Sequence, residues 1–259
     1  MTFSLRLTAD LALALAARAI GNKNGFPPIL QLSPDTDLQT ASASFSVTSH
    51  QADDSSSQSS ALVPRYRSPI LWVAGSEALD CPEVARFTNA LAASGRHVFL
   101  QTSGAPLKRR LHEFQPSSRF YFTVRFHGLD RLPGHGNACD GAFRVGMEAI
   151  RMARLAGFLT CAHFVVRPDG VAHQLEALHT EISKLDVDGF LITRAALLSE
   201  LEQNVNYLRR RLLSRRWALL SDLVESVTLP AASRDSRQLE RPPLAESQPD
   251  SFEEGAEAG

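Results

Sequence analysis

Short apolar runs recur along the chain, and segments with helical periodicity separate them. The run at 70–74 is continuously apolar and too short for a helix, which is typical of a strand buried on both faces of a parallel sheet. The predicted strands are 29–32, 70–74, 97–101, 120–126, 158–166 and 187–192. From 70 onward they begin roughly 22–38 residues apart, which leaves room for the helix of a right-handed β-α-β unit. The pattern predicts a parallel α/β fold of six units, and barrel and open sheet both satisfy it.

Helical periodicity fills the intervals between these strands. The predicted helices are 5–20, 82–95, 106–114, 143–156, 171–185 and 195–227. In the first, Leu7, Leu11 and Leu15 recur every four residues, which predicts an amphipathic helix packed on the domain. A membrane-surface or partner-binding helix is the alternative, and it is disfavoured because the polar face is not basic. Asp10 within the apolar stretch also argues against a signal peptide.

Composition sets the limits of the ordered domain. Nine of the nineteen residues in 42–60 are serine, so we expect 33–68 to be a disordered Ser-rich loop. Residues 229–259 hold seven acids against three arginines and are expected to form a disordered acidic tail. The expected division is 1–32 (helix and first strand), 33–68 (loop), 69–228 (barrel) and 229–259 (tail).

The net charge and the length of the apolar runs limit where the protein can be located and what it can bind. The chain has 259 residues and a formal net charge of -1, so no global field marks a nucleic-acid or membrane protein. No apolar run approaches the roughly 20 residues that span a bilayer. We therefore expect a cytoplasmic protein without a transmembrane segment.

The chain has three cysteines, Cys81, Cys139 and Cys161, and no two of them form a Cys-x-x-Cys pair. A disulfide framework and a sequence-local zinc or iron–sulfur site are both disfavoured by this spacing. A metal site that combines Cys139 and Cys161 with His127, His135 and His163 is the alternative. Cysteine is commonly a small buried apolar residue, so the sequence favours packing over metal binding.

Three segments resemble radical S-adenosylmethionine (radical SAM) proteins. Residues 82–107, PEVARFTNALAASGRHVFLQTSGAPL, are similar to the family's His-Pro-Glu helix, glycine, strand and Thr-Asn-Gly. Residues 122–143, FTVRFHGLDRLPGHGNACDGAF, are similar to the stretch in which a strand ends in Leu-Asp-Gly and a Gly-x-Phe opens the next helix. Residues 73–78, VAGSEA, resemble the Gly-Gly-Glu-Pro turn. Residues 209–224 loosely resemble the C-terminal part of the hopanoid-biosynthesis branch.

The resemblance implies a partial TIM barrel of six β-α units and a SAM pocket at the strand ends. Carried over residue by residue, the vestigial pocket consists of Gly75, Ser76, Glu77, Thr102, Ser103, Gly104 and His127. Several of these depart from the family pattern. Ser76 replaces a glycine, Ser103 replaces an asparagine, and His127 replaces an aspartate.

The family holds a [4Fe–4S] cluster with Cys-x-x-x-Cys-x-x-Cys after the first strand, because such clusters need thiolate ligands. In this sequence the three positions fall on Leu38, Ser42 and Phe45. The resemblance therefore implies that the cluster motif is lost and that the radical reaction does not occur. On this reasoning no cofactor is expected, a [4Fe–4S] cluster is disfavoured, and SAM remains an allowed ligand.

Five arginines crowd the last predicted helix: Arg209, Arg210, Arg211, Arg215 and Arg216. They could contact phosphates or an acidic partner. A solvated helix face is the favoured interpretation, because no stacking aromatic residues or nucleic-acid-binding module accompany them. We therefore expect no nucleic-acid partner.

Three functions remain open from the sequence. The first is a catalytically inactive radical-SAM-like paralogue that serves as a binding or accessory subunit, with an active relative or another protein as its partner. The second is a protein that binds SAM or a nucleotide without radical chemistry. The third is an enzyme with cluster-independent chemistry, for which no nucleophile–base pair or carboxylate pair is evident.

Overall fold

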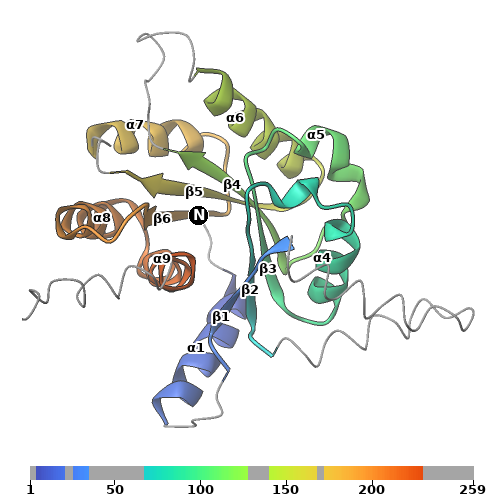
Figure 1. The fold of residues 1–259 in the computed structure, drawn as a ribbon, viewed down its shortest axis with the longest axis horizontal. Coiled ribbons are helices and arrows are strands. Elements are labelled where there is room, and N and C mark those ends of the chain that lie inside the picture. Colours follow the sequence, from blue (N-terminus) through green and yellow to red (C-terminus); the bar gives the residue numbers. More distant parts are fainter. Residues whose placement is uncertain (1–3, 21–25, 35–66, 128–139, 168–171, 230–259) are drawn as a thin grey trace, which may run out of the picture. The chain divides into compact units, whose positions relative to one another are not determined.

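The computed structural model describes residues 4–20, 26–34, 67–127, 140–167 and 172–229, and a parallel sheet forms its centre. The six strands of this sheet lie in the order in which they occur along the chain. They are β1 (Ile29–Leu32), β2 (Ile70–Val73), β3 (His97–Thr102), β4 (Phe120–His127), β5 (Leu159–Val166) and β6 (Gly189–Arg194). The sheet curls into part of a barrel (Figure 1), which confirms the expected partial TIM-barrel fold.

Helices connect the strands from β2 onward. The α-helices are α1 (Leu5–Ala19), α4 (Val84–Ala93), α5 (Leu107–Arg110), α6 (Asp140–Leu155), α7 (Ala172–Ser183), α8 (Ser199–Leu212) and α9 (Arg215–Thr228). Two short 3₁₀ helices, η3 (Ala78–Asp80) and η4 (Leu111–Glu113), flank α4 and α5. Figure 1 shows α4, α5, α6, α7 and α8 around the outside of the curved sheet.

The outer face of the sheet is apolar and packs against these helices. A Cβ on Gly146 of α6 would lie 2.8 Å from the ring of Phe126, so this glycine lets α6 approach β4 closely. Lower on the same face, the rings of Phe120 and Phe122 lie 6.0 and 5.0 Å from the ring of Phe158. Burying one side chain of this size stabilises the folded state by about 1.5–3 kcal/mol. The outer face therefore supplies much of the apolar core.

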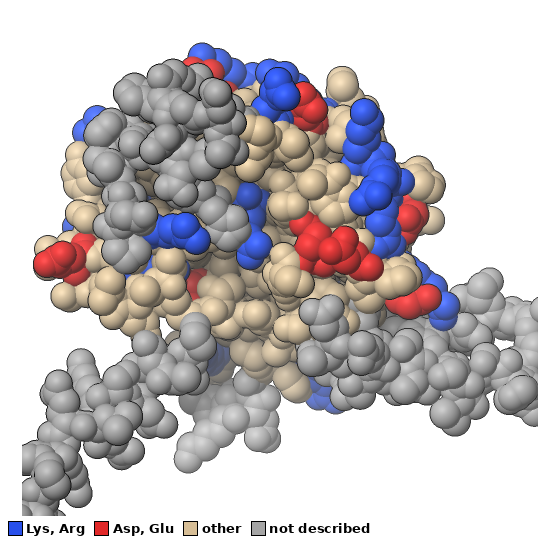
Figure 2. Space-filling view, turned by 45° about the horizontal axis from the view of Figure 1, so that its top comes forward, with Lys and Arg blue, Asp and Glu red and all other residues tan. Residues whose placement is uncertain are grey.

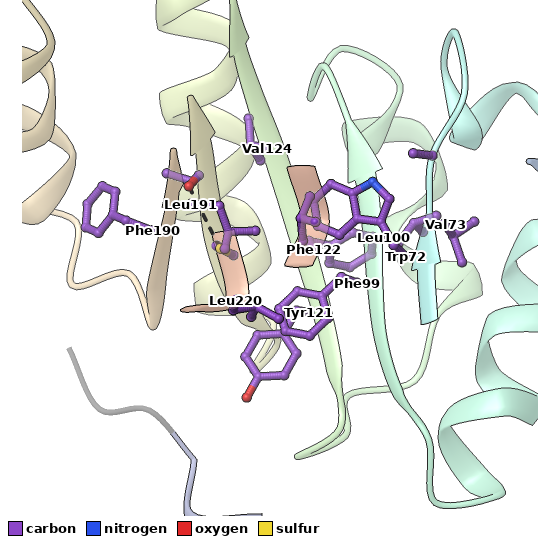
Figure 3. Packing of buried hydrophobic residues seen from close by; sticks show 14 of the residues in the cluster. Trp72, Val73, Phe99, Leu100, Tyr121, Phe122, Val124, Phe190, Leu191 and Leu220 are labelled. Carbon is purple, nitrogen blue, oxygen red and sulfur yellow. Dashed lines mark hydrogen bonds between the residues drawn. The ribbon is translucent and has the colours of Figure 1, made fainter. Parts of the chain in front are cut away.

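The inner face is filled near the amino ends of the strands. Alternate residues of each strand point inward, and Gly189 of β6 is one of them. A Cβ at Gly189 would overlap the indole of Trp217, so the absent side chain makes room for α9. This helix also packs against β1 and so spans the gap between the two edge strands. Leu220 of α9 and Tyr121 of β4 both belong to the buried cluster drawn in Figure 3.

Helix α1 attaches to the amino-terminal side of the sheet through three polar residues, here named the Asp10 cluster: Asp10, His97 and Arg119. One carboxylate oxygen of Asp10 lies 2.9 Å from Nε2 of His97 and 2.9 Å from the guanidinium of Arg119. Leu7 and Leu11 flank Asp10 along the helix and are buried. The helix therefore packs on the domain along its apolar stripe.

The single helix expected over 195–227 is instead two helices. Helix α8 ends at Leu212 and α9 begins at Arg215, with Leu213 and Ser214 in extended backbone conformations between them. Periodicity missed this break because the apolar residues keep a helical spacing on both sides of it.

The expectation of a solvated basic face is wrong for Arg209, which is only 4% exposed. Its guanidinium donates to the carbonyl of Ile192 at 2.7 Å, pairs with Glu225 at 2.7 Å and also contacts Asp222. β6 is an edge strand whose outward carbonyl needs a donor, and Arg209 supplies it. The other four arginines of the run are exposed.

Helix α9 satisfies the rest of this strand edge. The hydroxyl of Ser221 accepts a hydrogen bond from the backbone N–H of Ile192 at 3.1 Å. The carboxylate of Glu225 accepts from the backbone N–H of Arg194 at 2.9 Å and pairs with its guanidinium at 2.6 Å. Side chains of α8 and α9 thus replace the neighbouring strand that a complete barrel would provide.

Several sequence expectations fall outside the described residues. The Ser-rich loop 33–68 lies outside them except at its ends, and the acidic tail does so after residue 229. Residues 1–229 form one compact unit by their contacts. Within the described ranges, no helix is both long enough and apolar enough to cross a membrane.

Candidate ligand site at the carboxyl ends of the strands

Polar side chains gather on the inner face of the half-barrel, toward the carboxyl ends of the strands. They are Gln31 of β1, Gln101 of β3, Thr123 and Arg125 of β4, His163 of β5 and Thr193 of β6. In register, Gln101 pairs with Thr123, and Arg125 pairs with His163, so these residues form adjacent rows on one face. Barrels and parallel α/β sheets bind ligands at this end of their strands. These polar residues therefore form the candidate ligand site.

A hydrogen-bonded chain crosses the inner face from β3 to β6. The amide nitrogen of Gln101 lies 3.4 Å from Nδ1 of His163, and Nε2 of His163 lies 2.8 Å from the hydroxyl of Thr193. If the amide donates to Nδ1, the imidazole is neutral and donates through Nε2. The hydroxyl of Thr193 is then an acceptor, so His163 is not placed to activate it as a nucleophile. The indole of Trp72 meets the imidazole edge-on, with ring centroids 5.3 Å apart.

The turns after β2 and β3 are joined through Glu77. Its Oε2 accepts hydrogen bonds from the backbone N–H of Ser103 at 2.7 Å and from the Ser103 hydroxyl at 2.6 Å. Its Oε1 accepts a longer one from the backbone N–H of Leu79 at 3.3 Å. A carboxylate offers about four lone-pair positions, so one acceptor position on Oε1 is left after these three bonds. The carboxylate is held in a fixed orientation at the rim of the barrel.

Gly104 makes the turn after β3 possible. Its φ of +91° lies in the left-handed region that favours glycine, and a Cβ there would lie 2.8 Å from the Cβ of Ala149. The backbone N–H of Gly104 donates to the hydroxyl of Thr102 at 3.0 Å. This turn geometry places the Ser103 N–H and hydroxyl opposite Glu77.

Arg125 is a half-buried cation without an ion pair among the described residues. One terminal nitrogen donates to the carbonyl of Ser76 at 3.4 Å, and Nε is buried with no partner in the described part of the chain. Burial lowers the pKa of Arg125, and the nearby charge of Glu77 partly opposes that shift. In Figure 2, basic atoms lie set back in the middle of the view beside a group of acidic ones.

The structure brings together some of the site residues expected from the sequence. Gly75, Ser76 and Glu77 follow β2, and Ser103 faces them from the end of β3. Thr102 lies on the helix-covered side of β3, and its hydroxyl is engaged by the turn rather than turned inward.

Other expected positions cannot be compared in the same way. His127 is the last residue of β4, opposite Val165 in register, and its side chain is outside the described residues. The cluster-motif positions Leu38, Ser42 and Phe45 lie entirely outside them, as do His135 and Cys139.

Sequence reasoning missed Arg125 and Trp72 as site residues. Arg125 is the one charged residue between the aromatic and β-branched residues of β4, a signal that could have identified it. A charged side chain inside a buried strand needs a partner or a ligand. Trp72 lies within a continuously apolar run, where nothing in the sequence distinguishes it from a core residue.

The described cysteines take no part in this site. Cys161 is fully buried in β5, where burial raises the pKa of its thiol well above the usual value, so it stays protonated and unreactive. Cys81 follows η3 and is partly exposed. Within the described ranges, no three His, Cys, Asp or Glu side chains are grouped in a way that could hold a metal ion.

No protein-family model matches the sequence, and no curated protein matches it either. Solved structures resemble part of the fold. The archaeal TYW1 structure matches with a TM-score of 0.41 and 12% identity over 57% of this chain and 51% of that one. The structure of Streptococcus suis SuiB bound to S-adenosylmethionine matches with a TM-score of 0.46 and 11% identity over 62% of this chain and 43% of that one.

The likeness to both structures concerns the fold alone. This chain spans about half the length of those proteins or less. At these identities the matches say nothing about activity, and the resemblance to the hopanoid-biosynthesis branch stays a prediction.

One expectation from the sequence is corrected here. The expectation of no cofactor, with a [4Fe–4S] cluster disfavoured, is wrong on this comparison: the SuiB structure holds bound S-adenosylmethionine. The cluster-motif positions used for that expectation lie outside the described residues. We therefore do not retain it.

Proposed function

We propose that this protein binds S-adenosylmethionine, or a closely related adenosyl ligand with an amino-acid end, at the carboxyl ends of β2 and β3. One observation carries the proposal, the fixed carboxylate of Glu77. Ser103 and Leu79 orient it, and one acceptor position on Oε1 is left over. An α-ammonium group is the natural partner for such a position. The resemblance of residues 73–78 and 102–104 to SAM-binding turns points to the same ligand.

The residues present fit this ligand in charge as well as in geometry. Glu77 has no ion-pair partner among the residues that the structure describes, so a ligand cation would not compete with a protein cation. Among the described residues, the hydroxyl of Ser103 is the one side-chain donor on its carboxylate. When bound, SAM would supply a reactive sulfonium centre. The chain's own contribution is to hold the ammonium end at Glu77.

Thermal unfolding with and without ligand tests this proposal. A ligand that binds only the folded state stabilises it by about 2.7 kcal/mol at a concentration 100 times its Kd. We expect SAM and its demethylated product to raise the Tm of the full chain, because both carry the α-ammonium group. Adenosine lacks that group and should give a smaller shift.

Variants then locate the site. Glu77→Gln should remove most of the shift given by SAM, and Ser103→Ala should weaken it by freeing the carboxylate. Glu83→Gln is the matched control, since Glu83 is 54% exposed and makes only a surface pair with Arg86. A SAM-induced shift that is equal in Glu77→Gln and in Glu83→Gln would rule this site out.

A second proposal concerns catalysis, and a separate observation favours it. The sequence contains no Cys-x-x-x-Cys-x-x-Cys motif, and its first cysteine is Cys81. We propose that the chain does not itself cleave SAM by the radical route and acts as a binding or accessory subunit. Anaerobic reconstitution with iron, sulfide and a strong reductant tests this. Formation of 5′-deoxyadenosine by the purified chain would contradict it.

A further inference from the structure

We propose that the inner face of the half-barrel binds an oxyanion, a carboxylate or phosphate group, between Arg125 and Trp72, and that this group belongs to a second ligand distinct from the adenosyl one. The inference does not depend on SAM binding, because the proposed donors are on Arg125 and Trp72 and not on Glu77 or Ser103.

The first step is the state of two buried N–H groups. Nε of Arg125 and Nε1 of Trp72 are both buried and have no hydrogen-bond partner among the described residues. Trp72 is 0% exposed. Buried donors are nearly always paired, and an unpaired one costs about 1–3 kcal/mol. Neither group can accept a hydrogen bond, so only an acceptor can satisfy both.

The second step is that the two donors belong to one region. The indole of Trp72 reaches across from β2 to contact His163 of β5, with ring centroids 5.3 Å apart. His163 is the register partner of Arg125 on the adjacent strand. In Figure 3 the indole nitrogen of Trp72 points toward the carboxyl ends of β3 and β4. The hydroxyl of Tyr121 points the opposite way, toward their amino ends. Both donors therefore face the upper inner face of the barrel.

A third polar group lies in the same region. Thr123 precedes Arg125 by two residues on β4, so its side chain is on the same face of the strand. Its hydroxyl is buried, 0% exposed, and has no partner in the described ranges. Three buried groups with unmet hydrogen bonds thus lie on the inner face of the sheet, and the oxygen atoms of a ligand would satisfy them.

The last step concerns the sign of the charge around Arg125. Arg125 makes no ion pair with any described acid, and its hydrogen bond to the Ser76 carbonyl is long, at 3.4 Å. The charge of Glu77 acts on Arg125, but the Glu77 carboxylate is hydrogen-bonded to Ser103 and forms no ion pair with Arg125. His163 is held by Gln101 and Thr193 and adds no negative charge. Arg125 and Trp72 therefore present one positive charge and unpaired N–H donors, which are complementary to an oxyanion.

Titration calorimetry at constant ionic strength tests the inference with two probes, inorganic phosphate and acetate. We expect saturable binding of at least one of them to the full chain, and the stronger probe identifies the group. Arg125→Gln should weaken its Kd at least tenfold, because it removes the charge and most of the donors. Trp72→Phe keeps the aromatic packing against Phe99, removes the N–H, and should weaken binding several-fold.

Arg144→Gln is the control for charge, because Arg144 is an exposed residue of α6. It should bind the probe as the wild type does. Circular dichroism and the Tm without ligand verify that each variant is folded. Equal affinity in Arg125→Gln and Arg144→Gln, or no saturable binding of either probe by the wild type, would overturn the inference.

A competition experiment separates the two ligands. With SAM present, the phosphate or acetate affinity should stay within about twofold if the oxyanion site serves a second molecule. Displacement of the probe by SAM would show that the site holds the carboxylate of SAM, and the claim of a second ligand would fail. A chain that binds the probe but not SAM would contradict the proposed function and leave this inference standing.

Discussion

The substitution Glu225→Ala tests whether the side chains of α8 and α9 stabilise the edge strand β6. The Glu225 side chain is 7% exposed and pairs with the Arg209 side chain, which is 5% exposed, and its carboxylate also accepts a hydrogen bond from the backbone N–H of Arg194. Glu225→Ala would leave the Arg209 guanidinium buried, with Asp222 as its one acidic partner in the described part of the chain, and the Asp222 side chain is 59% exposed.

The expected loss follows from the burial of this pair. Removing one partner of a buried ion pair costs about 3–5 kcal/mol. The remaining contact with Asp222 places the expected loss near the lower end, about 3 kcal/mol. For a domain of this size each kcal/mol corresponds to about 2–4 °C. The Tm should therefore fall by about 6–12 °C.

Urea unfolding followed by circular dichroism measures the change. Glu202→Gln is the control, since Glu202 is 55% exposed and pairs with Arg194 at the surface. Such surface pairs contribute less than about 1 kcal/mol. The urea midpoint should fall in Glu225→Ala with an unchanged slope. A loss in Glu225→Ala no larger than in Glu202→Gln would refute the idea that α8 and α9 close the edge of β6 through this buried pair.

Two further predictions concern the turn after β3 and the attachment of α1. Gly104→Ala should destabilise the chain by about 1–3 kcal/mol more than Gly95→Ala. Both glycines have positive φ, but only the Cβ at 104 meets a neighbour, so the difference in urea midpoint isolates the steric contact with Ala149; equal losses would refute it. In the Asp10 cluster, burial would raise the pKa of Asp10, but its hydrogen bonds bring that pKa below the usual value. The stabilisation is therefore present above the unfolded pKa of about 4 and is lost as the pH falls through the lower folded pKa. The difference in the free energy of unfolding between wild type and Asp10→Asn should shrink as the pH falls from about 5 to about 2. A difference that grows as the pH falls would contradict this assignment.

Much of the fold could be predicted from local pattern. The run at 70–74 and the aromatic run at 120–126 correspond to β2 and β4, because a strand buried on both faces must be apolar throughout. Gly95 and Gly157 mark helix ends with positive φ, as expected for glycines after a helix. The break between α8 and α9 could not be predicted, since it depends on where Arg209 meets the edge of β6.

The candidate site was only partly accessible from the sequence. Glu77 and Ser103 stood out through the resemblance of their turns, but the bond between them joins residues 26 positions apart. Arg125 and Trp72 belong to the site only because β2, β4 and β5 curl around a common inner face. Strand period alone cannot say which face of a fully buried strand is inner and which is outer.

The sequence by itself determined the order of strands and helices and the parallel α/β class, because burial on both faces and helical spacing are local properties of the chain. It also determined that the chain contains no Cys-x-x-x-Cys-x-x-Cys motif. Tertiary structure decided the rest. The curl of the sheet gathers side chains from separate strands, and the cost of leaving buried N–H and C=O groups unpaired selects which of them meet. Arg209 and Glu225 satisfy backbone groups at the edge of β6 for this reason. For the same reason, the unpaired donors of Arg125 and Trp72 indicate a ligand.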